Sequence, residues 1–266
     1  MVASWTMLTP DRPEPSSLGR ADLHLHTSWS DGMATVRQVL EHAERHTDLD
    51  VIAITDHDQV RGALEAVEWC AGRPGGRLQA IVGTEISSAW GRHVLALFFA
   101  EPFPREPFPR FRSLADTVAA VHDAGGIVVL PHPCSRLVPS VGERTFRAMM
   151  GGRPRSVVQA LQGIEVCSGV IGGRAAEAKL RRVNAIWGLA TVGSSDAHHL
   201  AQIGSACTRF PGRTPADLLR AIYDRRTSAE WGSEPRVSLL EHVRQNWRSL
   251  VVKPARELRG LVTHTP

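Results

Sequence analysis

The sequence predicts an α/β protein with a largely parallel sheet, either open or closed into a barrel. Stretches typical of strands and helices alternate about seven times along 266 residues, at spacings typical of βα units. The run Val-Ile-Ala-Ile at 51–54 is wholly apolar, as expected for a parallel strand buried on both faces. The chain is also long enough for a single α/β barrel, which takes about 250 residues.

Seven strands are predicted, most of them short apolar runs bounded by turn residues. The first, 20–26, carries histidines at alternate positions. The third, 78–83, is followed by Thr-Glu, and the fifth, 127–130, is followed by Pro-His. The predicted strands are 20–26, 51–54, 78–83, 93–99, 127–130, 163–166 and 189–192.

Helices are predicted from capping residues and from the spacing of apolar side chains. Thr35 is a favourable N-cap, and Val36, Val39 and Leu40 would share one face of the helix that follows. Gly125 is a typical stop signal for another helix. The predicted helices are 35–45, 60–70, 112–124, 174–187, 214–226 and 237–250.

The composition favours a cytoplasmic globular protein. The formal net charge is +4 with all 12 histidines neutral, which suits an anionic substrate but is far from a protein that coats nucleic acid. The four cysteines are widely spaced without a Cys-x-x-Cys pair, which indicates a reducing compartment. The N-terminal residues lack the pattern of a signal peptide, and no stretch of about 18 apolar residues predicts a membrane span.

Histidines and carboxylates recur where the predicted strands end. His24 and His26 stand at i and i+2 of a strand, so their side chains would share one face and could bind one metal ion. In parallel α/β folds the chemistry lies at the carboxyl ends of the strands. His93 fits this rule poorly, because it begins its strand. The candidate metal ligands are His24, His26, Asp31, His57, Glu85, His93, His132, Asp196 and His198.

These motifs resemble those of the PHP superfamily, the polymerase and histidinol phosphatase domain. They are Asp22-Leu23-His24-Leu25-His26-Thr27 with Asp31-Gly32, Ile54-Thr55-Asp56-His57-Asp58, Gly83-Thr84-Glu85, His93, Pro131-His132-Pro133 and Ser195-Asp196-Ala197-His198. The similarity covers about residues 20–200 and is greatest to the short stand-alone members. It implies a distorted seven-stranded (β/α)7 barrel and the hydrolysis of phosphate esters.

The resemblance also implies two or three divalent metal ions, which would be Mn, Fe or Zn. The first ion would take His24, His26, Glu85 and Asp196; the second Glu85, His93 and His132; the third Asp31, His57 and His198. Clustered divalent ions activate a bound water and hold phosphate oxygens, so no serine or cysteine nucleophile is needed. The expected substrate is a small anionic phosphorylated molecule, a class that includes nucleotides and the end of a short oligonucleotide.

Three further residues are predicted to assist the reaction. Asp58, like Asp56, would hold an imidazole in the tautomer that binds metal. Arg136 would clamp a phosphate, because a guanidinium matches phosphate geometry. His199 would protonate the leaving oxygen.

The chain is expected to have three regions. Residues 1–19, rich in proline, would form a flexible N-terminal arm. Residues 20–233 would form the PHP metal-dependent phosphoesterase domain, in which the basic segment 135–162 would cover the mouth of the site. Residues 234–266 would form a C-terminal helical extension that docks on its own barrel or on a partner.

Other functions are open at this stage. An amidohydrolase-like hydrolase of a non-phosphate substrate also begins with His-x-His on a first barrel strand. Its usual bridging lysine has no counterpart, because Lys179 lies in a predicted helix and Lys253 in the tail. A metal site that only stabilises the fold would be closed and four-coordinate. A nucleic-acid-binding module is less expected, because the net charge of +4 is low and the single tyrosine offers little stacking surface, but the seven tryptophans keep this alternative open. The oligomeric state is not predicted.

Overall fold

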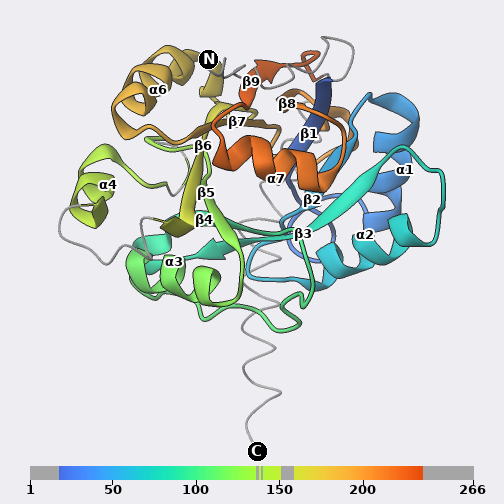
Figure 1. Cartoon of the computed structure of the whole chain (residues 1–266), viewed down its shortest axis with the longest axis horizontal. Coiled ribbons are helices and arrows are strands. Elements are labelled where there is room, and N and C mark those ends of the chain that lie inside the picture. The colour runs from blue at the N-terminus through green and yellow to red at the C-terminus, as the bar shows by residue number, and fades with distance from the viewer. Residues whose placement is uncertain (1–17, 136–137, 139, 151–158, 236–266) are drawn as a thin grey trace, which may run out of the picture.

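A computed structural model describes residues 18–135, 138, 140–150 and 159–235. Within this part of the chain, nine strands form one sheet in the order β7-β6-β5-β4-β3-β2-β1-β8-β9 (Figure 1). The strands are β1 (Leu18–Leu25), β2 (Val51–Ile54), β3 (Gln79–Ser87), β4 (His93–Phe98), β5 (Ile127–Leu130), β6 (Leu161–Ser168), β7 (Ala190–Ser194), β8 (Ala206–Pro211) and β9 (Ser228–Trp231). The predicted arm was to end at residue 19, but β1 already begins at Leu18. Residues 1–17, the predicted C-terminal helix 237–250 and parts of segment 135–162 lie outside the described residues.

The sheet curls into a nearly closed barrel. The barrel closes where β7, at one edge of the sheet, approaches β8 near the other edge. There the Thr208 hydroxyl donates a hydrogen bond of 2.9 Å to the Gly193 carbonyl and accepts one of 3.1 Å from the Gly193 amide. Just beyond β7, Ala197 bridges to β1 and accepts a hydrogen bond from the His26 amide at 2.9 Å. The barrel architecture predicted from the sequence is therefore confirmed.

The number and direction of the strands differ from the prediction. All seven predicted strands are present, but β8 and β9 were not expected, and both are antiparallel additions at one edge of the sheet. Strand β4 is antiparallel to both of its neighbours, β3 and β5. Only five residues separate β3 from β4, which is too short for the crossover helix that a parallel pair needs.

Helices cover the outer face of the barrel and one end of its interior. The helices are α1 (Val36–His46), α2 (Arg61–Ala71), α3 (Leu114–Asp123), α4 (Glu143–Met150), α6 (Gly173–Trp187) and α7 (Pro215–Tyr223), with short 3-10 turns η2 (Ala89–Gly91) and η3 (Leu200–Gln202). As predicted, Thr35 caps α1, and its hydroxyl accepts a hydrogen bond from the Gln38 amide. No helix among the described residues is long and apolar enough to cross a membrane.

Two apolar clusters hold these layers together. One lies between the outer face of the sheet and the surrounding helices, and it includes Val39 and Leu40 of α1. The other contains strand residues such as Leu23 and Val129 together with Leu218 and Ile222 of α7. In Figure 1, α7 accordingly lies in front of the strands, separate from α1 and α2. Burying these side chains is the main force that shapes the barrel.

Candidate metal centre

The structure brings all nine predicted ligands together. Their potential ligand atoms fall into four overlapping groups, and within each group these atoms lie no more than 4.8 Å apart. The groups are His26, Asp31, His57 and His198; His24, His132 and Asp196; His24, His26 and Glu85; and His57, Glu85 and His93. His26, His24, His57 and Glu85 each belong to two of these groups, so the groups share side chains.

Strand β1 delivers His24 and His26 to the cluster. Both imidazoles are buried, with ring centroids 5.1 Å apart. Leu23 and Leu25, which alternate with these histidines, belong to different apolar clusters. The register of β1 against β2 shifts between Asp22 and Leu25, and such a bulge redirects the side chains that follow it.

The carboxylate of Glu85 lies at the centre of the cluster. It is buried on β3, two residues inside the strand end at Ser87, whereas the sequence predicted that the strand would stop at Gly83. Five imidazole nitrogens lie within 3.3 Å of its two oxygens. These are His93 Nδ1 at 2.9 Å, His57 Nδ1 at 3.1 Å, His132 Nε2 at 3.2 Å, and His24 Nε2 and His26 Nε2, both at 3.3 Å.

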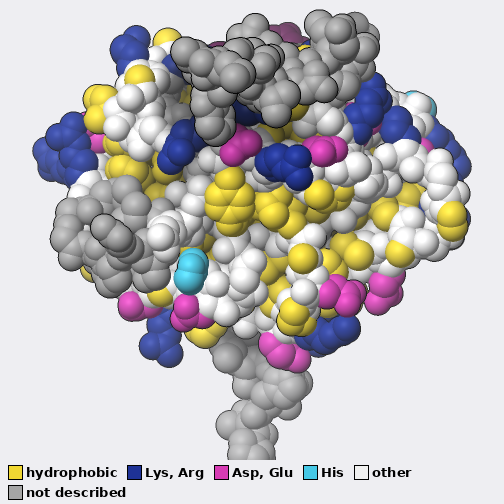
Figure 2. Space-filling view, viewed as in Figure 1, with side chains coloured by type: hydrophobic (Ala, Val, Ile, Leu, Met, Phe, Trp, Pro, Cys, Tyr) yellow, Lys and Arg dark blue, Asp and Glu magenta, His cyan; other side chains and the backbone are white. Residues whose placement is uncertain are grey.

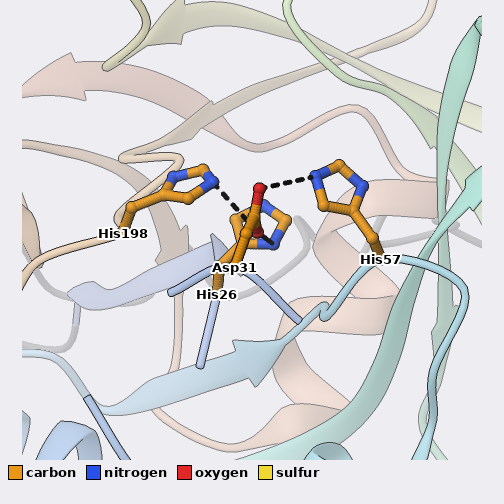
Figure 3. A group of neighbouring side chains, drawn as sticks. All are labelled: His26, Asp31, His57 and His198. Atoms are coloured by element: carbon orange, nitrogen blue, oxygen red, sulfur yellow. Dashed lines mark ion pairs between the residues drawn. The ribbon is translucent and has the colours of Figure 1, made fainter. Parts of the chain in front are cut away.

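Asp31 gathers three imidazoles on one side of the cluster, as Figure 3 shows. His198 Nε2 lies 3.4 Å from Asp31 Oδ1, and His57 Nε2 lies 3.7 Å from Asp31 Oδ2. The rings of His26 and His198 are stacked with centroids 4.2 Å apart. The loop that carries Asp31 is held by Asp56, whose carboxylate accepts hydrogen bonds from the Thr27 amide and hydroxyl and from the Ser30 hydroxyl.

Two ligands stand on strained backbone. His132 has φ of 30° and Asp196 has φ of 49°, in the left-handed region that side chains with a Cβ rarely adopt. Asp196 Oδ1 lies 3.1 Å from His26 Nε2 and 3.3 Å from His24 Nε2. Such strain collects at functional sites, where the surrounding fold holds the residue in place.

Glu165 is a member of the site that the sequence prediction missed. It lies on β6 and is fully buried. Its Oε1 lies 2.9 Å from His24 Nδ1, and its Oε2 accepts a hydrogen bond of 2.8 Å from the His132 amide. A carboxylate on Nδ1 fixes the tautomer that leaves Nε2 for a metal. The available signal was an acidic residue inside an otherwise apolar strand.

The structure describes the surroundings of two of the three residues that were predicted to assist the reaction. Asp58 accepts hydrogen bonds from the amide and hydroxyl of Ser87 and pairs with Arg110 Nε at 3.0 Å, so it secures the end of β3 through these contacts. The ring of His199 is buried and caps η3 by accepting from the Gln202 amide. Arg136 lies outside the described residues. Their parts in the reaction stay predictions.

The imidazoles and carboxylates of the cluster shift one another's pKa values in opposite directions. Burial raises the pKa of Glu85, but the surrounding imidazoles outweigh this and hold the pKa well below its usual range. The pKa of Asp31 is lowered in the same way, against burial, by His198 and His57. Burial alone would lower the pKa of His26, yet the nearby carboxylates raise it to about 10. Without a metal, protonated imidazoles therefore compensate the carboxylates.

These residues fit divalent metal ions. His24 Nε2 and both ring nitrogens of His26 are buried and make no hydrogen bond to any described residue, although carboxylate oxygens lie nearby. Buried polar atoms are normally satisfied, so such atoms call for an additional partner. Imidazole nitrogens with carboxylate oxygens are the ligand set of transition metals such as zinc, iron and manganese. Lys179 is exposed on α6, so it is not a bridging ligand.

Comparisons with known proteins agree with this geometry. A family model for the PHP domain matches residues 22–136, and a model described as PHP-associated matches residues 176–227. The chain is 29% identical over 146 residues to an uncharacterised protein of Methanocaldococcus jannaschii, covering 50% of this chain and 78% of that protein. It is 34% identical over 90 residues to a 3′,5′-nucleoside bisphosphate phosphatase of Chromobacterium violaceum, covering 34% of this chain and 30% of the phosphatase.

The fold is also found among solved structures. A two-domain protein of Bacteroides vulgatus, described as containing a PHP-like metal-dependent phosphoesterase, aligns with a TM-score of 0.59 and 21% identity over 87% of this chain and 70% of its own. The two family models together span both ends of the ligand set, from His24 to His198. The chain therefore belongs to the PHP superfamily of metal-dependent phosphoesterases.

Proposed function

We propose that this protein hydrolyses the phosphate ester of a nucleotide, or of the end of a short oligonucleotide, with two or three divalent ions of manganese, iron or zinc. The observation that carries the proposal is the convergence of nine imidazole and carboxylate side chains, with Glu85 among them, in one cluster. A structural metal site would be closed with four ligands, whereas this cluster has ligands for more than one ion.

The charges of the cluster suit an anionic substrate. Asp31, Glu85 and Asp196 contribute three carboxylates to the cluster and Glu165 contributes a fourth. Two divalent ions would balance these charges and three would exceed them, so the loaded site would accept an anionic phosphate. When bound, the ions would supply an activated water and hold the phosphate oxygens. The chain's own part is to fix that geometry, with Glu165 orienting His24 and Asp56 holding the loop of Asp31.

The proposal covers both a nucleotide and the end of a short oligonucleotide. On the face drawn in Figure 2, the Lys and Arg side chains of the described residues lie among acidic and apolar ones. A nucleotide is supported by the relative named as a 3′,5′-nucleoside bisphosphate phosphatase. The salt dependence of substrate affinity would separate the two cases, because it is steep for a polynucleotide and shallow for a mononucleotide.

The test combines metal content with activity. Protein purified without chelator would be analysed for metals per chain and then assayed with Mn²⁺. The readouts would be phosphate release from a mononucleotide and a 3′,5′-bisphosphate, nucleotide release from a short RNA, and p-nitrophenol release from p-nitrophenyl phosphate and its diester. We expect two or three ions per chain and release from at least one of these substrates. The variant His57→Ala should lose that activity, and His122→Ala, on the exposed surface of α3, should keep it. Failure of every substrate under every metal would refute the proposal.

A further inference from the structure

A cavity of about 190 Å³ opens beside the metal centre and shares His132 with it. Its walls come from three separate parts of the fold, namely the loop after β5, the end of β6 and the start of α6. The lining residues that carry the argument are His132, Ser168, Ile171, Gly173 and Ala176. The ligand role proposed for His132 leaves the remainder of this cavity without a function.

Most of the cavity wall is apolar. Val170, Ile171, Ala176 and Leu180 line it from α6 and the segment before it. The side chain of Ile171 is unusually open, with 74% of the residue exposed. An exposed branched side chain at the rim of a hollow next to a hydrophilic centre is a suitable contact for an organic group.

One polar group is buried in this wall. Ser168, at the end of β6, is 2% exposed, and its hydroxyl makes no hydrogen bond to any described residue. Buried hydroxyls are normally paired, so this one calls for a partner that enters the cavity. A ligand with an oxygen or nitrogen atom at that position would provide it.

The start of α6 adds to this polarity. The helix has 15 residues and begins at Gly173 without a side-chain cap and without an acidic residue in its first turn. A Cβ at Gly173 would lie 1.9 Å from the Ser168 carbonyl oxygen, so the helix start packs directly against Ser168. The positive end of the helix dipole favours an electronegative atom in the neighbouring cavity, which Gly172, Gly173 and Ala176 line.

We infer that this cavity is the subsite for the leaving group of the substrate, and that it takes a nucleoside. This rests on the proposed function. The ester phosphate would lie at the metal centre, the apolar walls would contact the base, and Ser168 with the start of α6 would pair with a hydroxyl or ring acceptor of the nucleoside. Ile171, Ala176 and Ser168 are then the residues that determine specificity.

The decisive variant fills the cavity. Ala176→Phe places a ring in it, and Ala175→Phe, one residue earlier and exposed on the same helix, is the matched control. We expect Ala176→Phe to raise KM for adenosine 5′-monophosphate at least tenfold more than it raises KM for glycerol 2-phosphate. Ala175→Phe should leave both KM values unchanged. Ser168→Ala should raise KM for the nucleotide severalfold with little change in kcat. Equal effects on both substrates, or none, would overturn the inference.

A binding measurement separates this inference from the proposed function. Adenosine alone, titrated into Mn²⁺-loaded protein by calorimetry, should bind to the wild type and to Ala175→Phe but not to Ala176→Phe. This result would support the subsite even if no phosphate ester were hydrolysed. If phosphate esters are hydrolysed but adenosine binds all three proteins alike or binds none, the proposed function stands and the subsite is refuted.

Discussion

His93 Nδ1 lies 2.9 Å from Glu85 Oε1, although His93 begins its strand and Glu85 lies near the end of another. The contact exists because β4 runs antiparallel to β3, and the register pairs His93 with Ser87. The start of β4 and the end of β3 consequently meet at the same edge of the barrel. His93 obeys the rule that ligands gather at that edge, even though its own strand is reversed.

Replacing Glu85 should disrupt the whole centre. Glu85→Gln removes the charge that lies within 3.3 Å of five imidazoles, so at least one ion per chain should be lost and phosphate release should fall about 100-fold or more, beyond the effect typical of an outer partner. Elemental analysis and initial rates at saturating Mn²⁺ would measure both. Glu68→Gln, on the exposed side of α2, is the control and should match the wild type. Unchanged metal content in Glu85→Gln would remove Glu85 from the ligand set.

The sequence predicted which polar side chains converge better than it predicted the number and direction of the strands. All nine candidates converge, because motif spacing places each of them near a strand end. β8 and β9 escaped prediction because Ala-Cys-Thr-Arg-Phe-Pro and Ser-Ala-Glu-Trp lack the apolar runs of the buried strands. Their pairing is set by tertiary contacts, such as those between Thr208 and Gly193, which no local pattern shows.

The role of Glu165 could not be predicted from the local sequence either, because it depends on residues that are distant in the chain. Its role depends on His24, 141 residues away in the chain, and on the backbone of His132. Neither partner can be identified from the residues around Glu165. The bulge in β1 is similar, because a strict alternation of residues would have placed Leu23 and Leu25 in one core.

Glu165 should act on metal affinity through His24. Glu165→Gln keeps the shape but weakens the acceptor on His24 Nδ1, so we expect metal affinity to fall about 10- to 100-fold with the fold retained. Competition with a chromophoric chelator would measure the affinity, and circular dichroism would check the fold. Glu177→Gln, on α6 and outside the ligand groups, is the control. If Glu165→Gln binds metal as tightly as Glu177→Gln, Glu165 does not position His24.

After metal removal, the free energy of unfolding should decrease as the pH rises into the alkaline range. In the metal-free protein the pKa of His26 is raised to about 10, whereas an unfolded histidine titrates near 6.5. The stabilisation from protonated His26 is thus fully present below about pH 6.5 and is lost as the pH rises through about 10. Urea midpoints of chelator-treated protein should fall between pH 7 and pH 10. The urea midpoint of the metal-loaded protein should fall less over this range, because a metal ion replaces the proton on His26. Equal slopes of urea midpoint against pH for the two forms would contradict this account.

The closure of the barrel can be tested at Gly193 of β7. A Cβ there would lie 2.3 Å from the carbonyl oxygen of Cys207 on β8, so Gly193→Ala must push the two strands apart where Thr208 joins them. Overpacking of this kind costs about 1–3 kcal/mol. Gly142→Ala is the matched control, because no atom lies within 4 Å of its added Cβ. Urea denaturation should show a clear loss of stability for Gly193→Ala and little change for Gly142→Ala. If both variants were as stable as the wild type, β7 and β8 would not be in contact and the sheet would be open at this seam.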